Sequence, residues 1–162
     1  DIIKQEKDID NMYIEQINEL LEIEIAGKGN YNPIPEPRKE LVECGKNYSY
    51  PRSKSTALKA LARADFQCEC QKNDVHPGFL RKTNGKNYTE PHHIIPLSEQ
   101  ECFINNLDVQ ANIVSLCSNC HNQLHYGIDP VPLLTHIYNK RKEELKLAGI
   151  SVSFNKLISF YI

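Results

Sequence analysis

The chain has 162 residues, 40% of them hydrophobic, which suffices for one domain with an extension but not for two full domains. Its formal net charge of −2 is unusual for a nucleic-acid-binding protein, but residues 50–88 carry 8 basic against 3 acidic side chains. Such a stretch can contact phosphates, although on charge alone a solvated surface is the favoured interpretation. The sequence has no membrane-length apolar run and no signal-peptide core, which predicts a cytoplasmic protein without a membrane segment. Because it begins with Asp1 rather than Met, we expect a fragment of a longer protein.

The N-terminal third predicts one helix followed by a linker. Residues 8–25 place apolar side chains such as Tyr13 and Ile17 at helical spacing. This apolar face must pack on the domain, on a missing N-terminal region or on a second copy, and packing within the chain is favoured. Residues 26–51 are rich in Pro and Gly and predict an irregular linker. The chain thus divides into an extension, 1–49, and a domain, 50–162.

The second part of the chain alternates predicted helices and strands, which indicates an α+β fold. Asn84-Gly85 favours a tight turn of a hairpin, and the strand after this turn leads into His92-His93. A β-branched run at 113–116 is able to pair with that strand. The other predicted elements are a helix from the Ser53 cap to Asp65, hairpin strands at 79–83 and 86–90, helices at 118–126 and 130–148, and a short strand and helix within 150–162.

Cysteines and one histidine form a first group with metal-ligand spacing. Cys117-x-x-Cys120 is one half of a tetrahedral zinc site, and the other half is expected about 50 residues upstream. Cys68 with His76 is the preferred upstream pair, and Cys70 is the alternative ligand because Cys68 and Cys70 are only two residues apart. This spacing predicts thiolate–metal chemistry in a reducing compartment. Cys44 and Cys102 are expected to be free thiols.

A second group consists of histidines. His92 and His93 end a predicted strand, where adjacent side chains point to opposite faces and therefore serve different tasks. His121 and His125 are four residues apart and share one face of a predicted helix. A metal ion between His92 and His121, with His125 nearby, is consistent with these positions. Single histidines are more often surface or core residues, but their combination with Asn112 and the cysteine pair favours a site.

The pattern of His92-His93, Asn112 and His121 resembles the HNH nucleases. It is most similar to the zinc-containing HNH domains of bacterial restriction endonucleases, including modification-dependent ones, and the resemblance covers about residues 50–162. It implies a small ββα-metal core with a structural zinc site, flanked by helices and by the N-terminal extension. The resemblance also implies Cys68, His76, Cys117 and Cys120 as the zinc ligands.

Carried over to this sequence, the resemblance implies a role for each residue of the motif. His93 is the general base, and Asn112 orients it by binding backbone of the connecting loop. His92 and His121 are catalytic metal ligands, with His125 as a further one. The implied cofactors are structural Zn²⁺ and catalytic Mg²⁺ or Mn²⁺.

The resulting hypothesis is a DNA endonuclease of restriction type that leaves 5′-phosphate and 3′-hydroxyl ends. Its expected partners are double-stranded DNA and a second copy of the chain, because double-strand cleavage needs two active sites or two visits. Arg81, Lys82 and Lys86 are candidate phosphate contacts beside the scissile bond. The alternatives are a non-catalytic zinc-binding module for nucleic acid or protein, and a zinc hydrolase of small substrates, which lacks a His-Glu-x-x-His signature.

Overall fold

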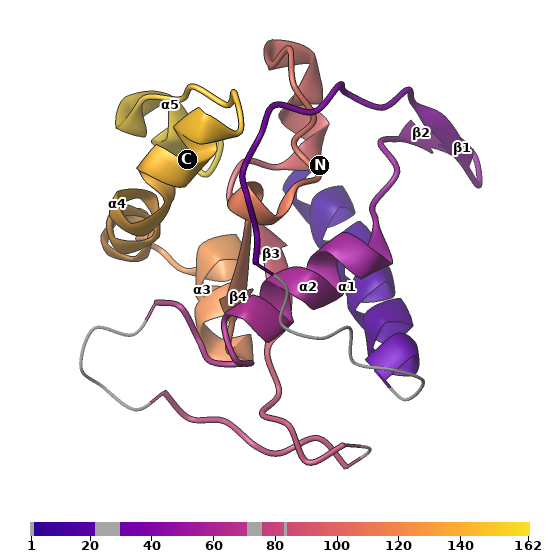
Figure 1. Ribbon diagram of the computed structural model, residues 1–162, viewed down its shortest axis with the longest axis vertical. Coiled ribbons are helices and arrows are strands. Elements are labelled where there is room, and N and C mark those ends of the chain that lie inside the picture. The colour runs from indigo at the N-terminus through magenta and orange to yellow at the C-terminus, as the bar shows by residue number, and fades with distance from the viewer. Residues whose placement is uncertain (1, 22–29, 71–75, 83) are drawn as a thin grey trace.

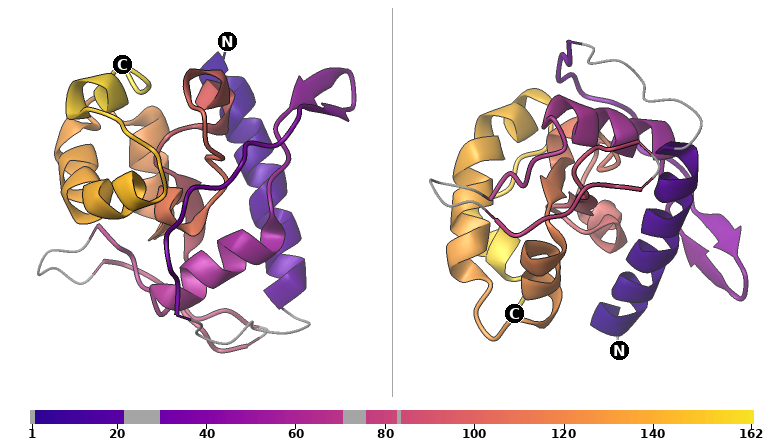
Figure 2. Two further views of the ribbon diagram at one scale, coloured as in Figure 1. Left: turned by 45° about the horizontal axis from the view of Figure 1, so that its top comes forward. Right: turned by 90° about the horizontal axis from the view of Figure 1, so that it is seen from below.

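The structure is a computed structural model that describes residues 2–21, 30–70, 76–82 and 84–162. Strands β3 (Glu90–His93) and β4 (Ile113–Leu116) form a small sheet at its centre, and helix α3 (Ser118–Tyr126) follows directly (Figure 1). Helices α1 (Ile2–Leu21) and α2 (Lys54–Arg63) lie on one side of this unit, and α4 (Val131–Leu147) with α5 (Phe154–Ile158) lies on the other (Figure 2). The fold is therefore α+β with a ββα core.

The central strands pair as the sequence predicts. β3 and β4 are antiparallel, and the register aligns His92 with Val114 and His93 with Ile113. All residues of both strands are buried, because helices cover the sheet and its apolar side chains join the main hydrophobic core. The two histidines thus lie at the end of β3, inside the protein rather than at an open edge.

The N-terminal helix packs within the chain. Tyr13 and Ile17 of α1 form a second hydrophobic cluster with α2 and Phe66, and Ile17 is only 1% exposed. This agrees with the favoured interpretation of the apolar face. The predicted helix 8–25 starts earlier, at Ile2, and ends at Leu21; residues 22–25 lie outside the described part of the chain. α2 begins at the predicted cap, where the Ser53 side chain accepts a hydrogen bond from the Thr56 backbone N–H.

The C-terminal helices complete the main core. α4 places Leu134, Ile137 and Leu145 in it, and Gly149 ends the helix with a φ of +71°, a conformation that costs glycine little. The short strand predicted within 150–162 is wrong: this segment holds α5 and turns but no strand. Its apolar side chains pack singly against the core instead of pairing with a sheet. None of the helices in the described ranges is long and apolar enough to cross a membrane.

Two connecting segments differ from their predictions. The predicted linker contains a projecting hairpin, β1 (Val42–Cys44) and β2 (Asn47–Ser49), with Gly45 at a φ of +64° in its turn. The hairpin expected around Asn84-Gly85 is present, but a single bridge between Leu80 and Asn87 replaces regular strands. Short 3₁₀ helices at Leu97–Cys102 and Gln110–Asn112 complete the connection from β3 to β4. This connection carries several of the polar residues described next.

Candidate metal centres and active site

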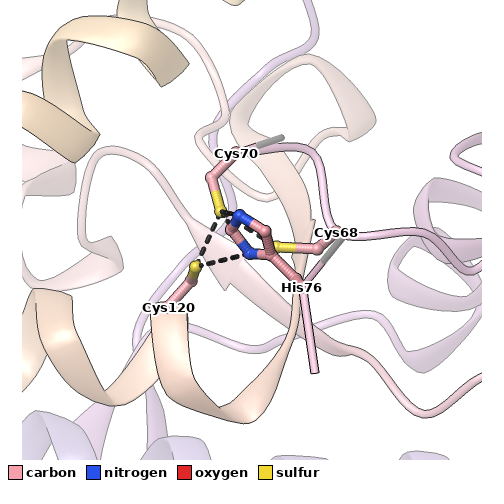
Figure 3. A group of neighbouring side chains, drawn as sticks. All are labelled: Cys68, Cys70, His76 and Cys120. Carbon is pink, nitrogen blue, oxygen red and sulfur yellow. Dashed lines mark hydrogen bonds between the residues drawn. The ribbon is translucent and has the colours of Figure 1, made fainter. Parts of the chain in front are cut away.

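Cysteine and histidine side chains converge at the start of α3 (Figure 3). Figure 3 shows Cys68, Cys70, His76 and Cys120 pointing toward one another, and their ligand atoms all lie within 4.8 Å of one another. The Cys70 sulfur is 2.7 Å from that of Cys120, and the Cys120 sulfur is 3.1 Å from His76 Nδ1. Three sulfurs and one imidazole are a donor set that suits a tetrahedral structural zinc. The chemistry of the cluster therefore fits Zn²⁺.

The cysteine predicted as an alternative ligand lies inside this cluster. Cys70 contacts both Cys68 and Cys120, whereas Cys117 lies at the edge, with its sulfur 3.6 Å from His76 Nδ1. Cys68 and Cys70 are two residues apart, but the intervening Glu69 is fixed against β4 by two hydrogen bonds with the backbone of Ser115. This anchor holds both thiols beside α3. The cluster thus offers five candidate ligands for a four-coordinate ion.

Ionisation of one thiol disfavours ionisation of its neighbours. Hydrogen bonds from Cys120 and Cys70 hold the pKa of Cys68 well below its usual range. The pKa of Cys120 is raised, because its contacts with Cys68 and Cys70 and its burial disfavour a second thiolate. A bound Zn²⁺ would stabilise several thiolates at once.

The second centre begins with His92 on β3. Tyr161 donates its hydroxyl hydrogen to Ile94 O at 2.6 Å, so toward His92 Nε2, 2.8 Å away, it acts as an acceptor. His92 therefore carries its proton on Nε2 and a lone pair on Nδ1. Nδ1 is buried and has no hydrogen-bond partner among the described residues. Burial and the neighbouring His121 and His125 lower the pKa of His92 well below its ordinary value, so that the ring stays neutral. An orphaned imidazole lone pair of this kind suits a metal ion.

The next two donors come from α3. Glu90 Oε2 accepts a hydrogen bond from His121 Nδ1 at 2.6 Å, which leaves the lone pair of His121 on Nε2. This Nε2 lies 3.2 Å from His125 Nε2, so the two rings on one face of α3 aim at the same point. Burial alone would raise the pKa of Glu90, but the hydrogen bond and charge of His121 lower it. The carboxylate that orients a histidine ligand in this way is typical of metal sites.

A carboxylate from α1 joins these histidines. Asp10 Oδ2 is 3.3 Å from His125 Nε2, and Asp10 with His92, His121 and His125 forms a group whose ligand atoms lie within 4.8 Å. Burial would raise the pKa of Asp10, but His125 and Arg52 hold it well below its usual range. The site thus brings together β3, α3 and the N-terminal helix.

His93, the predicted base, points to a different partner. Its Nε2 is 3.0 Å from Asp108 Oδ1, and both side chains are buried. Asp108 Oδ2 accepts from Lys39 Nζ at 2.9 Å and from the Ser53 backbone N–H at 2.6 Å. Although burial would raise the pKa of Asp108, the hydrogen bond and charge of His93 and the hydrogen bonds from Lys39 and Ser53 lower it. The carboxylate therefore holds Nε2–H of His93 and leaves Nδ1 to accept a proton.

Asn112 fixes the loop that follows His93. Its side-chain oxygen accepts from the Ile95 N–H, and its amide donates to the carbonyls of Ile95 and Leu107, all within 3.0 Å. Asn112 is fully buried, and its own backbone carbonyl accepts from the Ile94 N–H. These contacts tie the loop to the start of β4 and set the direction of the strand that carries His92 and His93.

The histidine centre opens into a pocket. A cavity of about 80 Å³ is lined by Asp10, His92, His93 and His125, together with Pro96, Ser98, Glu99, Leu124, Phe160 and Tyr161. A closed set of protein ligands is typical of structural sites, whereas a site beside a cavity keeps room for water or substrate. The two centres therefore differ in access as well as in donor type.

The predicted phosphate contacts fall into two classes. Arg81 is buried: its guanidinium donates to Thr89 O and lies 4.5 Å from the centre of the Tyr88 ring. Arg81 thus packs inside the hairpin, whereas Lys82 and Lys86 are exposed, and phosphate contact by these three residues stays a prediction.

Several site residues were not found from the sequence. Asp10, Glu90, Asp108 and Tyr161 lie far from the motif or carry no spacing signal, and their roles depend on tertiary packing. Glu90 and Asp108 had a weak signal, since histidine ligands and bases commonly have carboxylate partners. Asp10 and Tyr161 had none.

Comparison with known proteins places these centres in a family. Residues 69–127 match the family model described as HNH endonuclease, a range that includes His92, His93, Asn112 and the cysteine cluster apart from Cys68. The type IV methyl-directed restriction enzyme EcoKMcrA of Escherichia coli K12 is 32% identical over 112 residues, which cover 68% of this chain and 35% of that protein. The solved structure of the type IV phosphorothioation-dependent restriction endonuclease ScoMcrA matches with a TM-score of 0.48 and 26% identity, over 60% of this chain and 17% of that one. The chain thus spans about a third of its curated relative. Residues 69–127 form a domain of the HNH endonuclease family.

Proposed function

We propose that this chain is the nuclease part of a restriction enzyme and hydrolyses DNA phosphodiester bonds with a divalent metal ion. The observation that carries the proposal is the convergence of His92, His121 and His125, whose ligand atoms lie within 4.8 Å of one another, together with a His92 Nδ1 that has no hydrogen-bond partner among the described residues. The similarity to a restriction enzyme supports DNA as the substrate. The expected ends are a 5′-phosphate and a 3′-hydroxyl.

His92, His121 and His125 would hold the catalytic ion. Bound there, a divalent cation supplies charge stabilisation for the phosphate and for the leaving 3′ oxygen. Imidazole donors suit Mn²⁺ better than Mg²⁺, so Mn²⁺ is the first ion to test. Cys68, Cys70, Cys120 and His76, with Cys117 at the edge, would hold the structural zinc.

His93 is the proposed general base. Its Nδ1 takes a proton from the attacking water, while Asp108 keeps the other ring proton on Nε2 and favours the charged imidazole that results. Asn112 holds the loop behind His93 in place. Asp108 is thus a positioning residue, and the same geometry recurs in other hydrolases that use a carboxylate to orient a histidine.

DNA contacts outside the centre are proposed for Lys82 and Lys86. Both are exposed on the hairpin that precedes β3, at the opposite end of that strand from His93. They would therefore contact phosphates away from the cleaved bond. A dimer remains a proposal that cleavage of both strands favours.

The test is cleavage of supercoiled plasmid, methylated and unmethylated, with Mn²⁺ or Mg²⁺. His93→Ala should lower the rate by about 10²- to 10⁴-fold, while zinc content and thermal unfolding stay as in the wild type. His136→Ala is the matched control, because His136 lies on α4, outside both centres, and should cleave normally. Wild-type rates from His93→Ala would contradict the assigned base. A folded, zinc-containing wild type that cleaves neither plasmid would instead favour a non-catalytic zinc-binding module.

A further inference from the structure

We infer that Asp10 of α1 is a ligand of the catalytic metal, so that three histidines and one carboxylate hold the ion. The inference rests on the function proposed above, because it concerns the same centre. It assigns the N-terminal helix, which lies outside the matched residues 69–127, a direct part in metal binding.

The distances around Asp10 are those between neighbouring ligands of one ion. Asp10 Oδ2 is 3.3 Å from His125 Nε2, which is 3.2 Å from His121 Nε2. Ligands about 2.0–2.2 Å from a metal lie about 3.0–3.5 Å from each other in tetrahedral or octahedral geometry. The two contacts therefore match two edges of a single coordination shell.

The salt bridge with Arg52 does not by itself account for this placement. Asp10 Oδ1 pairs with Arg52, and this pair would be complete without any histidine. Yet Oδ2 faces His125, and one oxygen of the carboxylate lies within 4.8 Å of ligand atoms of His92 and His121. Arg52 thus holds one carboxylate oxygen and directs the other toward the centre, as residues behind a metal ligand commonly do.

The helix that carries Asp10 is fixed in position. Tyr13 and Ile17 lie three and seven residues after Asp10, on the same face of α1. The Tyr13 hydroxyl donates to Ser53 O at 2.8 Å, and Ile17 packs against α2. Asp10 therefore lies on a helix that is packed against the domain. Such a helix fixes the position of a side chain as precisely as a metal ligand requires.

The experiment is titration of the zinc-containing protein with Mn²⁺, followed by the electron paramagnetic resonance signal of free Mn²⁺. The variants are Asp10→Asn and, as a positive control, His92→Ala. Asp8→Asn is the matched control, because Asp8 is an exposed aspartate on the same helix. Zinc content and circular dichroism are measured for every variant, so that loss of fold is seen separately.

Asp10→Asn is expected to weaken Mn²⁺ binding by at least about tenfold, with Asp8→Asn unchanged. Unchanged or tighter binding in Asp10→Asn, together with loss in His92→Ala, would overturn the inference and leave the proposed function intact. Absence of Mn²⁺ binding in the folded wild type would overturn both.

A second variant covers the case in which Asp10→Asn does not fold. That substitution removes the carboxylate charge that pairs with the buried Arg52 guanidinium, which can be strongly destabilising. The double variant Asp10→Asn/Arg52→Gln removes both charges and should show the same loss of Mn²⁺ affinity. Wild-type affinity in the double variant would count against Asp10 as a ligand.

Discussion

The sulfur centre and the histidine centre share α3 but differ in how the chain builds them. The first draws its donors from Cys68, Cys70 and His76, which precede the sheet, and from the start of α3, and the second draws its donors from α1, β3 and α3. Donors contact each other in both centres, but in the second most of them are also oriented by a partner such as Glu90 or Tyr161. Soft thiolates suit zinc and stability, whereas oriented imidazoles beside a cavity suit exchange of ligands during a reaction.

From this difference we expect stability and chemistry to depend on separate parts of the chain. Changes at the sulfur centre should alter folding first and activity second. Changes at the histidine centre should alter metal affinity or rate with modest effects on folding. Each prediction below tests this division.

The largest effect is expected for Cys120→Ser, which removes a donor in contact with both Cys70 and His76. Loss of a structural metal should lower the free energy of unfolding by more than about 4 kcal/mol. Zinc content and urea unfolding measure this. Cys102→Ser, at an exposed free thiol, should change neither. Full zinc content in Cys120→Ser would remove Cys120 from the ligand set.

Ile17→Ala should loosen α1 from α2. Ile17 is almost fully buried in the second hydrophobic cluster, and loss of such a side chain costs about 2–5 kcal/mol. Thermal unfolding measures the loss, with Met12→Ala, which is 57% exposed on the same helix, as the control. Zinc content should stay constant while Mn²⁺ affinity falls. A parallel loss of zinc would show that the two centres are not separable.

Glu90→Gln should weaken Mn²⁺ binding by about 10- to 100-fold, because the amide no longer holds His121 as a carboxylate does. Calorimetric titration with Mn²⁺ measures the change. Glu99→Gln is the control variant. Glu99 also lines the cavity, but its carboxylate contacts Cys102 rather than a histidine. Equal affinities for the two variants would argue against the Glu90–His121 pair as a determinant.

The smallest effect concerns acid stability. The folded-state pKa of Asp108 is below its ordinary value, so the carboxylate stabilises the fold above the unfolded-state pKa of about 3.9. This stability is lost as pH falls from about 4 through the folded-state pKa. The free energy of unfolding should therefore fall more between pH 7 and pH 3 in the wild type than in Asp108→Asn. An equal fall in the two proteins would contradict a stabilising role for the ionised Asp108 carboxylate.

The sequence alone predicts the ββα core well, because its signals are local. The pairing of 113–116 with the strand of His92 and His93, and the shared face of His121 and His125, follow from short-range periodicity. The linker failed as a prediction because Gly45 permits a hairpin within a Pro- and Gly-rich segment. Local composition does not distinguish an irregular linker from a hairpin.

The site was less predictable where tertiary packing decides. Nothing in the spacing shows that Asp10 reaches His125, since this depends on how α1 docks on α2. The exchange of Cys117 for Cys70 in the tight cluster similarly depends on Glu69 binding β4. Arg81 seemed a surface cation, but the ring of Tyr88 and the carbonyl of Thr89 draw it inside.

The contacts of Tyr161 indicate which residues must accompany the HNH domain when it is transferred to another protein. Tyr161 fixes the tautomer of His92, and Asp10 lies at the opposite end of the chain, so both flanks of residues 69–127 reach the same centre. A cassette trimmed to the matched segment would keep the motif but lose the hydroxyl that sets one ligand and the carboxylate beside another. A transfer of this HNH domain into a fusion protein should therefore include both helical flanks.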